Sequence, residues 1–294
     1  MEIRALEFTS PVFQRFFNLG DDIQTLAVSR LLPRVDGYVC REGLDKVETE
    51  CVVPLNGFFM NTSHWPPSPK VHPVFFAFHV RPESVATVFS AAGIAYLLKW
   101  QPIGCRDLGT MALMQKHGID AYYSRCVTLT LPRREEEPGD NGQVFMVGLS
   151  DAARHAVPRH IRKKAIVVDQ AKVRLPITST SLKLALAKEL LEQYRANASL
   201  IITSKIHCAM PCIAMGIPVV FLYDRARRDD YRVKIINDLV GINYVHEHGL
   251  GAKYINALAS QRIDWSPKAL DIEALKADIR QQFLLAFDRV VKSV

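Results

Sequence analysis

The residues best suited to chemistry lie between positions 199 and 223. An apolar stretch at 200–203 runs into Ser204, Lys205 and His207, and a helix pattern follows. Unpaired backbone N–H groups and the positive end of the helix dipole favour an anion at such a helix start. Lys205 adds a positive charge, and an imidazole titrates near neutral pH. The segment therefore predicts an anion-binding turn, although a serine cap followed by a packed histidine has the same pattern.

A run of arginines follows the next predicted strand along the chain. That strand, at 218–223, is succeeded by Arg225, Arg227 and Arg228. The carboxyl ends of neighbouring parallel strands meet at one edge of a sheet, so we expect this run to face the turn that carries His207. A solvated surface is the alternative interpretation of the same charges.

A second turn offers an arginine fork beside a carboxylate. Gly104 permits a tight turn, and Arg106 has the planar geometry that suits a carboxylate or a phosphate. Asp107 could cap the following helix or accept a proton. His79 ends a predicted strand and would lie at the same edge of a parallel sheet, where a structural histidine is the alternative.

A third turn opens the first predicted helix. It contains Asn18, Gly20 and Asp21 and is polar enough to bind a phosphate or a sugar. A plain capping turn, with Asp21 or Asp22 as the cap, has the same composition.

The elements that must position these side chains alternate between strand and helix on both sides of a polar segment. Residues 132–142 contain no apolar residue and form the best linker in the chain. Before it we expect helices at 21–32, 83–98 and 106–117, strands at 51–55 and 74–78, a loop at 56–73 and strand character at 121–131. After it we expect strands at 144–147, 165–168, 200–203 and 218–223, and helices at 182–196, 206–215 and 270–291.

This alternation predicts an α/β fold with parallel sheets. We expect two Rossmann-like domains, at 1–133 and 143–269, around a central cleft. The last helix, within 270–294, is expected to pack back toward the first domain.

Composition narrows the function classes. The 294 residues are 49% hydrophobic and 23% charged, which excludes a wholly disordered chain. A net charge of +7 suits an anionic partner, but no block of five consecutive basic residues exists, so we expect no nucleic acid partner. The longest apolar run, at 212–223, is broken by Gly216 and Pro218 and is too short to cross a bilayer, and the N-terminus has no signal-peptide pattern. We therefore expect a cytoplasmic protein.

Several common catalytic and binding motifs are missing from the sequence. The six cysteines form no C-x-x-C pair, which excludes a zinc ribbon or a thioredoxin motif. G-x-S-x-G, the Walker A motif and G-x-G-x-x-G do not occur either.

Taken together, the three turns resemble the polysaccharide pyruvyl transferase family. The resemblance is carried by the loop at 18–21, the turn at 102–107 with 118–122 downstream, and the segment 203–207 followed by Pro211, Gly216, Pro218 and Val219. Their order and spacing match the family over about residues 15–225. One departure is Lys205, because the family usually has arginine there; lysine keeps the charge but loses the bidentate geometry.

The resemblance implies a GT-B-like fold and an activity. Members of the family transfer pyruvate from phosphoenolpyruvate onto two hydroxyls of a sugar, which forms a ketal and releases phosphate. The donor substrate replaces any cofactor, and no metal is implied. The acceptor would be a sugar or glycan, either free or lipid-linked.

The resemblance also implies roles for the residues above. We expect His207 to be the phosphate ligand or the general acid, and Asp107 or Asp21 to be the base. The expected binding residues are Asn18, Gly20, His79, Arg106, Ser204, Lys205, Arg225, Arg227 and Arg228. Two alternatives remain: a GT-B glycosyltransferase that uses a nucleotide-sugar donor, and a non-catalytic relative that binds a carbohydrate or an anion.

Overall fold

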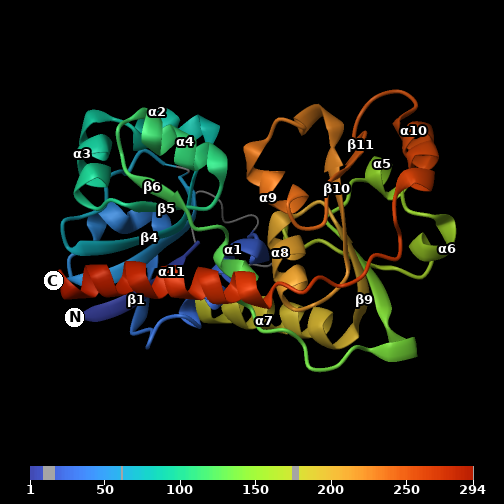
Figure 1. Cartoon of the computed structure of the whole chain (residues 1–294), viewed down its shortest axis with the longest axis horizontal. Coiled ribbons are helices and arrows are strands. Elements are labelled where there is room, and N and C mark those ends of the chain that lie inside the picture. The colour runs from blue at the N-terminus through green and yellow to red at the C-terminus, as the bar shows by residue number, and fades with distance from the viewer. Residues whose placement is uncertain (9–16, 61, 174–178, 294) are drawn as a thin grey trace.

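The computed structural model describes residues 1–8, 17–60, 62–173 and 179–293. Within these ranges the chain forms two parallel β-sheets with helices on their faces (Figure 1). The predicted α/β class with parallel sheets is confirmed. The GT-B-like arrangement, with boundaries at 133 and 143, stays a prediction.

The first sheet has six strands in the order β2-β1-β3-β4-β5-β6. They are β1 (Glu2–Glu7), β2 (Gly37–Cys40), β3 (Cys51–Phe59), β4 (Val71–Val80), β5 (Ile103–Cys105) and β6 (Ala121–Tyr123). The central strands β3 and β4 are buried along almost their whole length, as expected for a parallel sheet covered on both faces.

The second sheet has five strands in the order β11-β10-β9-β7-β8. They are β7 (Gln143–Val147), β8 (Ile166–Val168), β9 (Ala198–Thr203), β10 (Val219–Asp224) and β11 (Asn243–Val245). Every pairing within both sheets is parallel. Because of this, the carboxyl ends of the strands gather at one edge of each sheet.

Eleven α-helices connect the strands in the described part of the chain. They are α1 (Leu19–Ser29), α2 (Val85–Val88), α3 (Ala91–Lys99), α4 (Leu108–Lys116), α5 (Asp151–Arg154), α6 (Arg159–Arg162), α7 (Thr180–Asn197), α8 (Ile206–Ala214), α9 (Lys234–Asn237), α10 (Ala252–Ala259) and α11 (Glu273–Lys292). None of the described helices is long and apolar enough to span a membrane.

Four sequence predictions about single elements were wrong. The loop expected at 56–73 is shorter, because β3 continues to Phe59 and β4 begins at Val71. The helix expected at 83–98 is split into α2 and α3, because the Ser90 hydroxyl caps α3 by accepting from the Gly93 N–H. The strand character expected at 121–131 ends at Tyr123, and residues Val127–Thr130 form the 3-10 helix η4. The first helix is capped by Asn18, whose side chain accepts from the Gly20 N–H, and not by Asp21 or Asp22.

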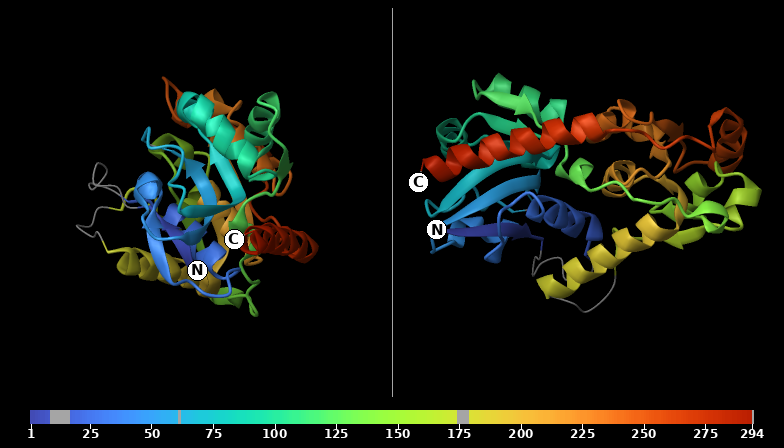
Figure 2. Two further views of the ribbon diagram at one scale, coloured as in Figure 1. Left: turned by 90° about the vertical axis from the view of Figure 1, so that its left-hand side faces the viewer. Right: turned by 60° about the horizontal axis from the view of Figure 1, so that its bottom comes forward.

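The largest hydrophobic cluster is shared by the two sheets. It joins Phe76 of β4 and Ile23 of α1 to Phe221 of β10 and Met210 of α8, all of them fully buried. Helix α11 lies along the first sheet (Figure 2), where Phe283 meets Phe76 edge-on with ring centroids 5.3 Å apart. The faces that the two sheets turn toward α1, α8 and α11 therefore form one continuous core.

Candidate functional site

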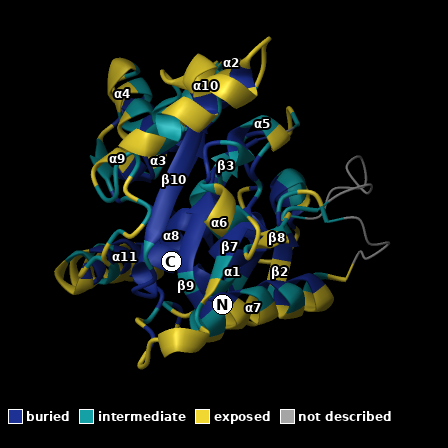
Figure 3. Ribbon diagram, turned by 90° about the vertical axis from the view of Figure 1, so that its right-hand side faces the viewer, coloured by how far each residue is buried: buried dark blue, intermediate teal, exposed yellow. Residues whose placement is uncertain are grey.

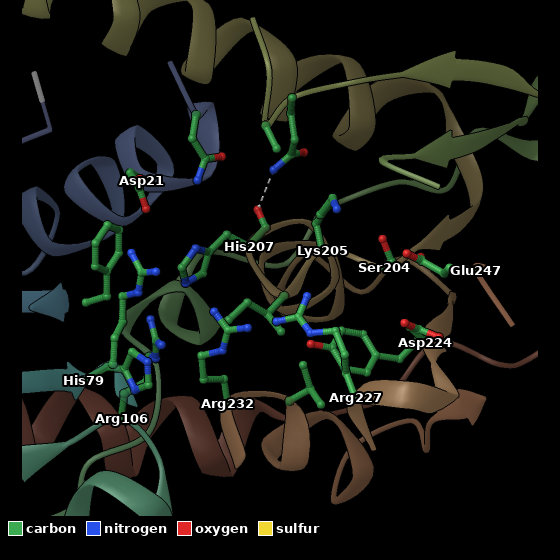
Figure 4. Close-up of a pocket in the computed structure, with 18 residues that line it drawn as sticks. Asp21, His79, Arg106, Ser204, Lys205, His207, Asp224, Arg227, Arg232 and Glu247 are labelled. Carbon is green, nitrogen blue, oxygen red and sulfur yellow. Dashed lines mark hydrogen bonds between the residues drawn. The ribbon is translucent and has the colours of Figure 1, made fainter. Parts of the chain in front are cut away.

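A cavity of about 380 Å³ lies where the strands of both sheets end (Figure 4). The first sheet and its connections supply Asn18, Asp21, Phe58, His79, Arg81 and Arg106, and the rest of the lining comes from Gln170, Ala171, Ser204, Lys205, Ile206, His207, Tyr223, Asp224, Arg227, Arg232, Val233 and Glu247. This is the position at which open parallel sheets bind their ligands.

Side-chain hydrogen bonds fix the turn between β9 and α8. The Thr203 hydroxyl donates to the Val147 carbonyl at 2.9 Å and accepts from the Lys205 N–H at 3.0 Å. The Ser204 hydroxyl donates to the Gly148 carbonyl at 2.8 Å. These bonds tie the turn to the end of the neighbouring strand β7, so the start of α8 is held rigidly against the cavity.

His207 is 8% exposed, and its Nε2 has no hydrogen-bond partner among the described residues. Burial holds the pKa of its imidazole well below the ordinary value, and nearby Arg106, His79 and Arg232 lower it further. His207 is therefore neutral among the groups that surround it. The sequence-based expectation of an imidazole that titrates near neutral pH does not hold for this state.

Gln170 holds His207 in place. Its Nε2 donates to the His207 carbonyl at 3.0 Å (dashed in Figure 4), and its Oε1 accepts from the Tyr194 hydroxyl at 3.2 Å. Its own backbone carbonyl accepts from the Leu19 N–H at 2.8 Å. One loop residue thus connects α1, α7 and α8.

Arg106 is a buried cation at the carboxyl end of β5. It is 3% exposed, and its Nε makes no hydrogen bond with a described residue. The nearest carboxylate oxygen, Oδ2 of Asp107, lies 3.8 Å from that Nε. Burial lowers the pKa of the guanidinium, but an arginine remains charged in proteins. A desolvated cation with an unused donor is suited to bind an anionic ligand.

His79 and Asp107 form a buried pair. The His79 Nδ1 lies 2.7 Å from Oδ2 of Asp107 and 3.2 Å from the Thr110 hydroxyl. Burial lowers the pKa of His79 to about 4, with a further decrease caused by Arg106. Burial alone would raise the pKa of Asp107, but the contact with His79 and the charge of Arg106 outweigh it, so this pKa is lowered. Asp107 is thus ionised and His79 neutral.

The role of Asp107 is to position other groups. Its Oδ1 accepts from the Thr110 N–H at 2.8 Å and caps α4, while its Oδ2 orients His79. Asp107 itself does not line the cavity. With the Nδ1 proton directed at the carboxylate, the Nε2 of His79 carries the lone pair.

Helix α1 brings Asp21 to the cavity and contacts α8. Burial raises the pKa of Asp21, while Arg41 and Arg106 oppose the shift. Gly20 does not line the cavity, but a Cβ built on it would lie 3.0 Å from the Cβ of His207 and from Oδ1 of Asn18. Glycine is needed here because α1 and α8 approach so closely.

Of the three predicted arginines, only Arg227 lines the cavity. Arg225 and Arg228 are exposed and are not brought to it. Arg232 takes their place: its Nε and Nη2 donate to the carboxylate of Asp230 at 2.8 and 2.5 Å. That contact raises the pKa of Arg232. No local pattern in the sequence indicated this role, because it depends on the ion pair with Asp230.

Two carboxylates lie at the end of the cavity away from Arg106. Asp224 and Glu247 gather there beside Ser204 (Figure 4). In the described part of the chain, these two residues and His248 form a group that could hold a metal ion, since one ligand atom from each lies within 4.8 Å of the others. The sequence analysis expected no metal ligands, and that expectation stays a prediction.

A parallel α/β fold with a cationic cavity at the strand ends is suited to bind an anionic ligand. A family model described as polysaccharide pyruvyl transferase matches residues 70–224. The chain belongs to this family, which makes it a transferase, and the resemblance seen in the sequence is confirmed. The matched segment contains His79, Arg106 and His207.

The comparisons with curated proteins and with solved structures carry no further argument about function. No curated protein matches the chain. A solved structure of an uncharacterized protein from Klebsiella pneumoniae subsp. pneumoniae is similar, with 10% identity and a TM-score of 0.49 over 83% of this chain and 92% of the other.

Proposed function

We propose that this transferase takes pyruvate from phosphoenolpyruvate and forms a pyruvate ketal on two hydroxyls of a sugar or glycan, with release of phosphate. One observation carries the proposal: Arg106 from the first sheet and the turn at 204–207 from the second line one cavity in a member of this family. We also propose that the reaction takes place in the cytoplasm.

The cationic end of the cavity suits the donor. Phosphoenolpyruvate carries a carboxylate and a phosphate, and Arg106 offers a planar fork to either. The start of α8 adds backbone N–H groups and the dipole, and Lys205 and Arg232 add charge. These groups are mostly desolvated, which strengthens their attraction for an anion.

Binding of the donor would supply the general acid. His207 is neutral partly because Arg106 and Arg232 repel a proton from it. The negative charges of the donor offset these cations, so the pKa of His207 rises when the donor binds. In this scheme His207 then delivers its proton to the methylene carbon of the donor, and the adjacent carbon becomes electrophilic.

The two hydroxyls then react in turn. The first hydroxyl attacks the electrophilic carbon and gives its proton to His79, which Asp107 keeps in the accepting tautomer. The second hydroxyl attacks as the phosphate group leaves, and its proton departs with the phosphate. Asp21, with its raised pKa, can relay that proton. The donor gains one proton at carbon and two C–O bonds and loses one C–O bond to phosphate.

The carboxylates at the other end suit the acceptor. Asp224 and Glu247 can accept hydrogen bonds from sugar hydroxyls, and Arg227 lines the same region. The same carboxylates favour the second candidate, a glycosyltransferase with a nucleotide-sugar donor, because a ribose also presents two hydroxyls. The sequence analysis identified no carboxylate for this role, and Glu247 supplies one.

A ligand-induced melting shift separates the two candidates. A ligand at about 100 times its Kd stabilises the fold by about 2.7 kcal/mol. We expect phosphoenolpyruvate to raise the Tm more than inorganic phosphate does, and UDP-sugars to leave it unchanged. No shift with phosphoenolpyruvate would overturn pyruvyl transfer, and a shift with UDP-sugars alone would favour the glycosyltransferase.

Replacement of His207 tests its role directly. His207→Ala should lower the rate of phosphate release, measured with a sugar acceptor, by about 10²–10⁴-fold, because a general acid is lost. The fold should persist. The matched control is His160→Ala, an exposed histidine on α6 that should leave the rate unchanged. An unchanged specific activity of folded His207→Ala would show that the histidine is only structural.

Replacement of Arg106 tests the donor site. Arg106→Lys should raise the apparent KM for phosphoenolpyruvate, because a fork is replaced by a point charge. The control Arg228→Lys changes an exposed arginine outside the cavity and should leave the KM unaltered. Equal KM values for the wild type and Arg106→Lys would place the donor elsewhere.

A further inference from the structure

Helix α10 presents its apolar side to solvent. Tyr254, Ile255 and Leu258 are 70%, 43% and 53% exposed, whereas the opposite side buries Ala252 and Asn256. Surface helices normally bury their apolar side and expose the polar one. The reversed arrangement in α10 indicates that another apolar surface covers it.

Asn256 shows that this orientation is built into the fold. Its Nδ2 donates to the carbonyls of Ala152 and His246, both at 2.8 Å, and its Oδ1 accepts from the His246 N–H at 2.8 Å. These three bonds fix α10 to α5 and to the loop before it. The apolar side cannot rotate inward without breaking them.

The loop before α10 extends the apolar surface. Leu250 is fully exposed between Gly249 and Gly251, which have φ values of 102° and 79°. We call Leu250, Tyr254, Ile255 and Leu258 the α10 surface. Large apolar side chains exposed together on one helix and the loop before it indicate an interaction site.

Basic side chains flank the α10 surface. Arg159, Lys163 and Lys164, in and just after α6, are exposed and form no ion pair with any residue that the structure describes. Helix α6 is joined to α5 by a hydrogen bond from Arg162 to the Arg154 carbonyl, and α5 is joined to α10 by the ion pair of Asp151 with Lys253. Helices α5, α6 and α10 lie at the same end of the molecule in Figure 1, and Figure 3 looks onto that end.

We propose that this end of the molecule docks on an anionic lipid surface. Aromatic and aliphatic side chains enter the interface between headgroups and acyl chains, and neighbouring cations bind the anionic headgroups. Charge favours an anionic membrane over a second copy of the chain as the partner. Three unpaired cations beside the exposed apolar side chains complement a negative surface, whereas they would repel each other in a contact between two copies.

The position of the surface suits an amphiphilic acceptor. Glu247 lines the cavity, and Leu250 follows three residues later, so the chain between them spans at most about 10 Å. A glycan could reach the cavity while its lipid carrier stays in the bilayer. This last step rests on the proposed function, whereas the docking surface does not.

Vesicle sedimentation tests the proposal. The wild type should sediment with phosphatidylcholine vesicles that contain about one-third phosphatidylglycerol, and added salt should weaken the binding as it screens the cations. The triple variant Leu250→Ser, Tyr254→Ser, Leu258→Ser should bind the vesicles at least about tenfold more weakly than the wild type. The control Leu284→Ser, Leu285→Ser changes two exposed leucines of α11, at the other end of the molecule, and should bind like the wild type.

Charge reversal tests the electrostatic part. Lys163→Glu, Lys164→Glu should weaken binding to the anionic vesicles by about tenfold or more at low salt. The control Lys116→Glu, Lys188→Glu makes the same change in net charge at exposed positions on α4 and α7 and should have little effect.

Three results would overturn the proposal. They are the lack of sedimentation with anionic vesicles, equal binding of the wild type and the triple variant, and equal binding to pure phosphatidylcholine. A dimer that the triple variant abolishes, without any vesicle binding, would assign the surface to a second copy instead. The assay contains neither phosphoenolpyruvate nor acceptor, so a failure of the proposed reaction would not alter its outcome.

Discussion

At the scale of single residues, burial sets the protonation states in the cavity. His79 and His207 are both desolvated next to cations, and both are neutral for that reason. The sequence identified these histidines by their places at a strand end and a helix start. It could not give their pKa values, because these depend on Arg106 and Arg232, which come from different parts of the chain.

The depressed pKa of His79 predicts a pH dependence of stability. Below pH 6.5 the unfolded chain binds a proton at this histidine, but the folded chain does not until the pH falls to about 4. Proton binding therefore stabilises the unfolded state relative to the folded state as the pH falls through this window. Between pH 7 and pH 5 the wild type should lose about 2 kcal/mol of unfolding free energy through this one group.

Urea unfolding of the wild type and His79→Asn at both pH values measures this loss. The variant has no titrating group at position 79, so its stability should fall less between pH 7 and pH 5. The comparison removes the contribution of every other group that both proteins share. Parallel pH profiles for the two proteins would contradict the buried, neutral state of His79.

At the scale of elements, the sequence predicted where the strands end better than it predicted which residues lie beside those ends in space. The turns after β5 and β9 were identified from Gly104, Arg106 and Ser204, because strand and turn residues are local signals. Gln170 and Arg232 were missed as site residues. Their roles arise from contacts with α8, α7 and Asp230, and no local pattern encodes such contacts.

One short element links the second sheet to the first. Tyr231, in the 3-10 helix η7 (Tyr231–Val233), donates its hydroxyl to the Val80 carbonyl at 2.7 Å. Its ring lies 5.7 Å from that of His79, and a Cβ on Gly109 would meet it at 2.4 Å. The next residue is Arg232, so this contact holds an arginine of the cavity against the opposite sheet.

Tyr231→Phe should weaken that link. It removes one hydrogen bond worth about 1 kcal/mol of unfolding free energy. We also expect a higher KM for phosphoenolpyruvate, because Arg232 is held less firmly. Tyr38→Phe, at a 42% exposed tyrosine of β2, is the control and should change neither quantity. Identical KM values for Tyr231→Phe and the wild type would show that Arg232 does not depend on this link.

At the scale of the whole molecule, the core that the two sheets share affects whether the two expected domains unfold separately or together. The polar segment at 132–142 predicts two domains around a cleft, and that division stays a prediction. In the structure α8 and α1 lie between the sheets, and the cluster that contains Phe76 also contains Phe221. Sequence patterns show which side of an element is apolar, but they do not show which of two sheets will cover it.

A shared core predicts a single cooperative unfolding transition. Phe283 of α11 is fully buried against Phe76, and Phe283→Ala should lower the unfolding free energy by about 3–5 kcal/mol. Because the cluster is continuous, the loss should destabilise both sheets together. Trp265 packs against the second sheet, so both proteins carry Trp265→Phe in this test. Urea unfolding followed by far-UV circular dichroism and by tryptophan fluorescence should then give coincident curves before and after the change, since the remaining Trp65 and Trp100 report on the first sheet and the backbone signal on both. Leu284→Ala, at a 51% exposed neighbour, should stay within about 0.5 kcal/mol of the wild type. If Phe283→Ala separated the curves into two transitions, the sheets would be independent domains, as the sequence alone suggested.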